Sequence, residues 1–118
     1  MVRNNARHGW ATCPFTQAAF VHITSNPAFS PDAVTPPEAA ALLAFNLNHA
    51  HHQFWPDDIT LTQAIEPFWD RLVGHQQVTD AYLLGLTIHR KGKLATLDHA
   101  VAALLASQTQ KDNFLTLL

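Results

Sequence analysis

The apolar positions in the first third of the chain form short stretches that end at proline. Residues 9–13 (GWATC) are short, apolar and closed by Pro14, which predicts a strand. Residues 15–25 then place apolar side chains three and four apart, the spacing of a helix, up to a stop at Pro27. The following PAFSPDAV is rich in turn formers and predicts a loop.

The middle of the chain carries a clear helix start. Thr35 precedes two prolines and Glu38, so threonine can cap the first backbone N–H groups while glutamate completes a capping box. This predicts a helix through residue 50, and residues 53–55, closed by proline, predict a short strand. Residues 61–73 predict another helix, with a break near Glu66 because Pro67 lacks an N–H group.

The C-terminal part reads QVTDAYLLGLTIHRKGKLATLDHAV and contains the two most apolar elements. Thr79 at the N-cap predicts a helix from Asp80 to about Lys91, with Gly92 as its stop. Its apolar residues cover more than one face, which favours burial between layers. Residues 94–97, 100–106 and 114–118 predict a strand, a helix and a last strand. This alternation indicates an α/β sandwich around a mostly parallel sheet.

Composition limits the classes of function. A chain of 118 residues with 47% hydrophobic residues predicts one domain with a modest core. A net charge of -2 gives no general attraction for RNA or DNA, so nucleic-acid binding would rest on a local patch, Arg90, Lys91 and Lys93. A single cysteine excludes an internal disulfide, and neither a membrane-spanning stretch nor a signal peptide is present in the sequence, so we expect a cytoplasmic protein.

Two aspartates lie at the ends of the apolar C-terminal elements. Asp80 follows a helix start, where the helix dipole favours a carboxylate, and Asp98 follows the LATL strand. Ligands of parallel sheets bind beyond the carboxyl ends of strands, so converging element ends would give a hard oxygen site for Mg²⁺ or Mn²⁺. The plainer alternative is that Asp80 only complements the dipole and Asp98 only caps the next helix.

Three stretches resemble the VapC family of PIN-domain toxins. GHQQVTDAYLLGLTIHRKGKLATLDHAV is similar to the family's C-terminal half, where a TDAYLLALA helix and an LATLD strand carry two metal-binding acids. GWATCPFTQAAFVHITSNPAFSP resembles its second strand and following helix, and FWPDDITL resembles its third strand. The resemblance covers residues 7–105 with every piece in family order, and the ordered set is specific.

The resemblance implies a PIN-like three-layer sandwich and a Mg²⁺-dependent endoribonuclease, the toxin of a toxin–antitoxin pair. Its partners would be an RNA substrate and a VapB-like antitoxin. Asp80 and Asp98 match catalytic, metal-binding acids, and the hydroxyl groups of Thr79 and Thr96 would support them. Gln17 stands where relatives carry glutamate, and a neutral amide binds a divalent cation more weakly than a carboxylate.

The family also begins with an aspartate-bearing strand and two helices that have no counterpart in this chain. The resemblance therefore implies a single, incomplete, N-terminally truncated PIN-like domain over residues 1–118, with weak or absent catalysis. Apolar surface left by the absent strand favours a homodimer. A second hypothesis is a catalytically silent remnant that binds an antitoxin or itself. A third is a transition-metal protein that uses His49 and His52, three residues apart.

Overall fold

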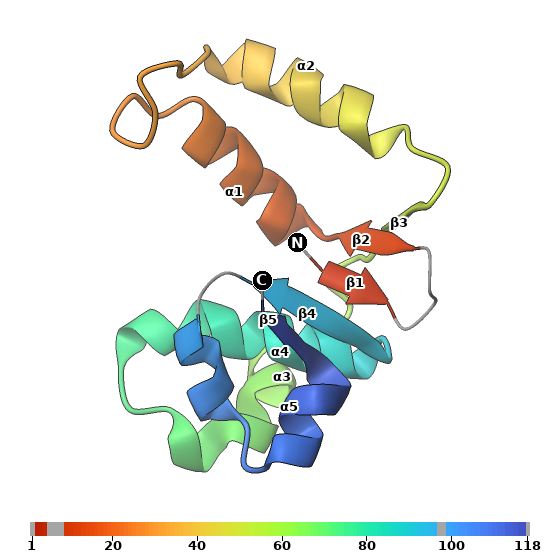
Figure 1. Cartoon of the computed structure of the whole chain (residues 1–118), viewed down its shortest axis with the longest axis vertical. Coiled ribbons are helices and arrows are strands. Elements are labelled where there is room, and N and C mark those ends of the chain that lie inside the picture. The colour runs from red at the N-terminus through yellow and green to blue at the C-terminus, as the bar shows by residue number, and fades with distance from the viewer. Residues whose placement is uncertain (1, 5–8, 97–98, 118) are drawn as a thin grey trace. The chain divides into compact units, whose positions relative to one another are not determined.

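The chain divides into two compact units in the computed structural model (Figure 1). Unit 1 comprises residues 1–10 and 57–118, and unit 2 comprises residues 11–56. The structure describes residues 2–4, 9–96 and 99–117, and it describes the side chains of residues 9–96 and 99–116. The prediction of one PIN-like domain over residues 1–118 stays a prediction.

Unit 2 is built around a helical hairpin and a short strand pair. Strand β2 (Trp10–Thr12) leads into α1 (Pro14–Thr24), and α2 (Pro36–Leu47) leads into β3 (His52–Phe54). Helices α1 and α2 pack together, and the Trp55 N–H group donates to the Thr12 carbonyl at 2.8 Å. The two predicted helices and the two predicted strands are therefore confirmed.

Local sequence explains both helix starts in unit 2. The backbone N–H group of Cys13 donates to Thr16 Oγ1 at 2.9 Å, ahead of Pro14. In the predicted capping box of α2, the Glu38 N–H group donates to Thr35 Oγ1 and the Thr35 N–H group donates to Glu38 Oε1, each at 3.3 Å. The Thr35 hydroxyl, which donates to Glu38 Oε1 at 2.8 Å, and in second place the Thr35 N–H group hold the pKa of Glu38 below its ordinary value. The helix ends at Leu47, three residues before the predicted end.

Unit 1 contains a three-stranded sheet centred on β4 (Gly92–Thr96). Strand β5 (Leu115–Leu117) runs parallel to β4, with Leu94 opposite Leu115. Strand β1 (Val2–Asn4) runs antiparallel to β4, and the sequence did not predict it because three residues are too few for an alternating pattern. The α/β class is confirmed, and β1 adds an antiparallel pair to the predicted parallel one.

The helices of unit 1 are short except for α4 (Val78–His89). The others are α3 (Leu61–Ile65), η1 (Glu66–Arg71), η2 (His75–Gln77), η3 (His99–Leu104) and α5 (Gln108–Phe114), where η marks a 3₁₀ helix. The predicted break near Glu66 is confirmed, since η1 begins there with Pro67 in its first turn. Residues 100–106 were predicted as an α-helix, but their core is the tighter η3. Helix α5 was missed because its polar residues lack apolar spacing.

Both predicted ends of α4 need correction. Thr79 is not the N-cap: α4 begins at Val78, and Thr79 is its second residue. The reason is that η2 runs directly into α4, so the chain is already helical at Gln77. At the other end, Lys91 rather than Gly92 adopts the left-handed conformation, with φ 59°, and Gly92 begins β4.

The contact between α3 and α4 forms the centre of unit 1. Leu84 and Leu86 of α4 are fully buried, as is Ala64 of α3. A Cβ atom at Gly85 would lie 2.1 Å from the carbonyl oxygen of Ala64, so the two backbones approach as closely as glycine allows. Among the helices of the described residues, none is long and apolar enough to cross a membrane.

Replacing Gly85 by alanine should therefore destabilise the protein strongly. The new methyl group would overlap backbone atoms of α3, and overpacking of this kind costs about 1–3 kcal/mol or more in the free energy of unfolding. Urea denaturation followed by circular dichroism measures the loss. Gly74→Ala is the matched control, because no atom lies within 4 Å of the place that its new methyl group would take, and its stability should change little. Equal stability of the two variants would contradict the close contact of α3 with α4.

Candidate active site

Asp80 and Thr96 come to the same end of the pair formed by α4 and β4. Helix α4 has 12 residues and spans ~18 Å, while the five residues of β4 span ~17 Å. Only residues 90–91 connect them, and the two elements pack against each other, so the strand returns along the helix. Thr96, the last residue of β4, therefore lies at the end of the pair where α4 begins. Asp80, the third residue of α4, lies at the same end.

Asp80 is half-buried in the first turn of α4. Backbone N–H groups of that turn point toward the helix start and favour a carboxylate there. Both Asp80 and Thr96 interact with other residues. Asp98 lies outside the described residues, so its predicted approach to Asp80 stays a prediction.

The described residues do not by themselves make a complete metal site. Within residues 2–4, 9–96 and 99–117, no three His, Cys, Asp or Glu side chains gather so that they could hold a metal ion. Asp80 is the one predicted acidic ligand in this part of the chain. The Nε2 atom of His52 is hydrogen-bonded to Thr12 at 2.8 Å, which occupies one nitrogen of the predicted His49 and His52 pair.

Gln17 of unit 2 belongs to a hydrogen-bond chain that the sequence did not reveal. Its Nε2 donates to Thr12 Oγ1 at 3.0 Å, and Thr12 Oγ1 is 2.8 Å from His52 Nε2. The His52 ring also hydrogen-bonds the backbone of Leu47, which occupies the other ring nitrogen as a donor. Nε2 then accepts from the Thr12 hydroxyl, whose oxygen accepts from the Gln17 amide. The members lie up to 40 residues apart, so no spacing rule could have found them.

The hydrogen bonds that join Gln17, Thr12 and His52 depend on a neutral His52 side chain. Burial lowers the pKa of His52 below its ordinary value of 6.5, and the nearby His49 acts in the same direction, while the hydrogen bond to Leu47 partly opposes them. The Thr12 side chain is almost fully buried, at 6% exposure. A protonated His52 would no longer accept the Thr12 hydroxyl proton, so protonation opposes the native arrangement.

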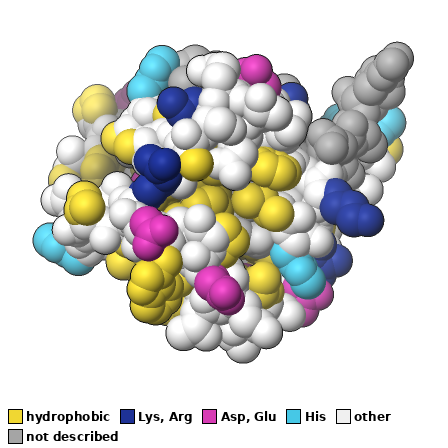
Figure 2. Space-filling view, turned by 90° about the horizontal axis from the view of Figure 1, so that it is seen from below, with side chains coloured by type: hydrophobic (Ala, Val, Ile, Leu, Met, Phe, Trp, Pro, Cys, Tyr) yellow, Lys and Arg dark blue, Asp and Glu magenta, His cyan; other side chains and the backbone are white. Residues whose placement is uncertain are grey.

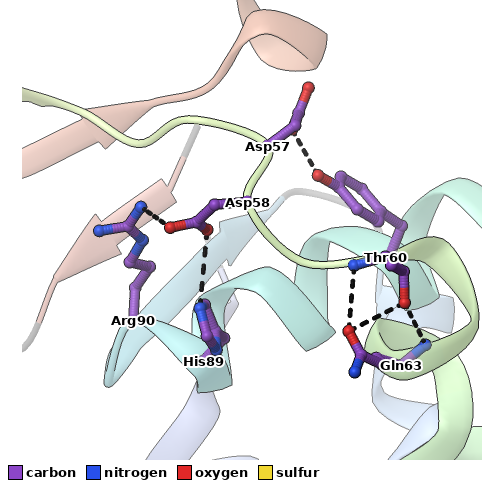
Figure 3. Close-up of polar contacts among 7 residues, drawn as sticks. Asp57, Asp58, Thr60, Gln63, His89 and Arg90 are labelled. Carbon is purple, nitrogen blue, oxygen red and sulfur yellow. Dashed lines mark hydrogen bonds and ion pairs between the residues drawn. The ribbon is translucent and has the colours of Figure 1, made fainter.

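The predicted basic patch is partly neutralised. Nη2 of Arg90 lies 2.6 Å from Asp58 Oδ2, and His89 Nε2 lies 3.6 Å from Asp58 Oδ1 (Figure 3). Lys91 is exposed and Lys93 is partly exposed on β4. Asp58 was not among the predicted site residues, since its partner Arg90 is 32 residues away.

Charged side chains are sparse on the visible surface as well. On the face drawn in Figure 2, Lys and Arg side chains occur as separate spots, with Asp and Glu among them and hydrophobic side chains gathered between. No broad basic field covers this face, in agreement with the low net charge. A polyanion would therefore meet local clusters of charge rather than a continuous basic surface.

The fold is that of an α/β protein, and relatives with known names place it in the PIN class and identify the family. No family model matches the chain. The chain is 40% identical over 95 residues to Ribonuclease VapC39 of Mycobacterium tuberculosis, spanning 80% of this chain and 68% of the relative. Ribonuclease VapC38 of the same species is 40% identical, over 91% of this chain and 73% of the relative. Ribonuclease VapC44 of the same species is 31% identical, over 98% of this chain and 81% of the relative. The chain belongs to the VapC family of PIN-domain ribonucleases.

Protein stability should rise with pH in the range where His52 loses its proton. The pKa of His52 is lower in the folded protein than in the unfolded chain, so the unfolded chain binds more protons between the two values. The stabilisation is complete above pH 6.5 and is lost as pH falls toward the lower, folded pKa. Urea denaturation at a series of pH values measures this effect.

His52→Gln should flatten the rise, whereas the exposed His75→Gln should keep it. An identical pH dependence in the wild type and in the His52→Gln variant would contradict a depressed pKa for His52.

Proposed function

We propose that the chain is an endoribonuclease, the toxin of a toxin–antitoxin pair, which cleaves phosphodiester bonds of RNA. The observation that carries this proposal is the 40% identity to two proteins named ribonucleases, over 68% and 73% of their lengths. The position of Asp80 supports it, because the carboxylate lies at the end of unit 1 where β4 also ends. Cytoplasmic RNA would be the substrate.

The two aspartates have the central roles in the proposed reaction. Asp80 and Asp98 would act as catalytic, metal-binding carboxylates, and the hydroxyl groups of Thr79 and Thr96 would support them. Thr79 is an exposed neighbour of Asp80 in the first turn rather than a cap. Bound Mg²⁺, or Mn²⁺, would activate water and stabilise charge on the phosphodiester.

Gln17 would weaken the activity relative to a glutamate at the same position. Its amide nitrogen is held by Thr12, and the side chain carries no negative charge to offer a divalent cation. Arg90, Lys91 and Lys93 would contact RNA phosphates. The partners would be a VapB-like antitoxin and a second copy of the chain.

Replacing Asp80 by asparagine should reduce RNA cleavage about a hundredfold or more, because a catalytic centre that loses or misplaces a ligand loses rate by that order. The measurement is gel-resolved cleavage of labelled RNA with Mg²⁺ and with a chelator. Asp98→Asn should act alike. Asp112→Asn, an exposed acid in α5, is the control and should retain activity. Full activity of the Asp80→Asn variant, or cleavage that persists with chelator, would refute the proposed site.

A second candidate function is binding without catalysis, and the surface of unit 2 favours it. Six large apolar side chains of this unit are exposed, with Phe45 of α2 exposed by 80%. They are Phe15, Ile23, Phe29, Leu42, Phe45 and Phe54. Exposed apolar side chains in this number are typical of surfaces that bind an antitoxin or another copy of the same chain.

This candidate predicts self-association that depends on Phe45. Removing a phenylalanine from an apolar interface costs about 2 kcal/mol, so Phe45→Ser should weaken the dimer about tenfold or more. Sedimentation velocity over a concentration series measures the dissociation constant. Asn46→Ser, an exposed neighbour on α2, is the matched control. A chain that stays monomeric and binds no antitoxin would exclude the binding function.

A further inference from the structure

Asp58 accepts a hydrogen bond from Arg90 and lies near His89, at the end of α4. One carboxylate oxygen lies 2.6 Å from Nη2 of Arg90, and the other lies 3.6 Å from Nε2 of His89 (Figure 3). The side chains are partly open to solvent, with exposed fractions of 45% for Asp58, 29% for Arg90 and 44% for His89. A ligand from solution can therefore reach the place that the carboxylate fills.

The Arg90 guanidinium matches a phosphate as well as a carboxylate. A guanidinium presents a planar fork of N–H groups that fits two oxygens of a phosphodiester. Asp58 binds Nη2 of this fork, while Nε of Arg90 on the same edge is buried and has no hydrogen-bond partner among the described residues. Half of the fork is thus unused, and a buried donor without a partner favours any ligand that satisfies it.

The surrounding charge favours an anion. Lys91 and Lys93 adjoin Arg90 in sequence, so three of the chain's seven Lys and Arg residues lie within four positions. The left-handed backbone of Lys91 ends α4 and turns the chain into β4. The acids nearby are Asp58, which binds Arg90, and its neighbour Asp57, which accepts a hydrogen bond from the Tyr82 hydroxyl. Removing Asp58 from Arg90 would leave a cluster of positive charge at this turn.

We propose that residues 89–93 form a binding site for a backbone phosphate of RNA, and that Asp58 occupies this site in the RNA-free protein. RNA displaces the Asp58 carboxylate and binds the Arg90 guanidinium in its place. Exposed ion pairs are weak, so the displacement is easy compared with the gain from several phosphate contacts. The choice of RNA as ligand rests on the proposed function. Because Asp58 competes for Arg90, polyanions that are short or bind weakly are held less tightly.

The test is binding of a short fluorescent single-stranded RNA, followed by anisotropy in chelator so that no cleavage occurs. Asp58→Asn should bind about threefold or more tightly than wild type, because the competing carboxylate is gone. The affinity of Asp58→Asn should also fall more steeply with salt concentration, by the increase in slope that about one additional phosphate contact gives. Asp57→Asn is the matched control, since it removes the same charge from the same loop without touching Arg90, and its affinity should change less than about twofold.

Arg90 variants complete the experiment. Arg90→Ala should weaken binding and should abolish the gain in an Asp58→Asn, Arg90→Ala double variant. Arg90→Lys keeps the charge but loses the fork, and it should bind less tightly than wild type. The proposal is overturned if Asp58→Asn, with a wild-type circular dichroism spectrum, binds RNA no more tightly than wild type, or if neither binds RNA.

The same measurements separate this site from the proposed catalysis. A gain in RNA affinity by Asp58→Asn in a protein that does not cleave RNA supports the phosphate site and refutes the nuclease. Cleavage that depends on Asp80, with no effect of Asp58→Asn on affinity, supports the nuclease and refutes the phosphate site.

Discussion

The close contact of α3 with α4 is the constraint on which unit 1 depends. Gly85 lets the backbone of α4 approach Ala64, and this approach accompanies the burial of Leu84 and Leu86. With α4 fixed, β4 packs back along it, and the similar lengths of the two elements put Asp80 and Thr96 at one end. The position of the candidate catalytic acid is thus a consequence of core packing, although glycine itself takes no part in chemistry.

Polar contacts between residues far apart in the sequence fix the side chains of Gln17 and Arg90. Gln17, at the position where the family resemblance expects glutamate, donates to Thr12, and Thr12 is hydrogen-bonded to His52. These partly buried hydrogen bonds hold the Gln17 amide in place. In unit 1, Asp58 neutralises Arg90, and the same contact marks the place where a phosphate fits. A chain with only 14% charged residues concentrates its electrostatics in a few such contacts. The Asp58 contact links the proposed RNA-binding turn to the loop that precedes α3.

Local rules predicted much of the fold. The capping box at Thr35 and Glu38 and the break at Pro67 were recognised because each depends on residues within one turn. Other features depended on neighbours in the chain or in space. Thr79 failed as a cap because η2 already holds Gln77 in helical geometry, and β1 exists because β4 offers it a partner. Helix α5 forms although its sequence has no apolar face; Ser107 caps it by accepting from the Gln110 N–H group at 3.2 Å.

The sequence by itself determined the α/β class, most helices and strands, the family resemblance and the choice of Asp80 as a candidate acid. These properties depend on local propensity and on motifs of a few residues, which are readable along the chain. Only the tertiary structure decided that Arg90 faces Asp58, that Gln17 is tied to His52 through Thr12, and that Gly85 lies against Ala64. Each of these pairs joins residues that are more than 20 positions apart in the chain, so no local pattern records them, and packing alone brings them together.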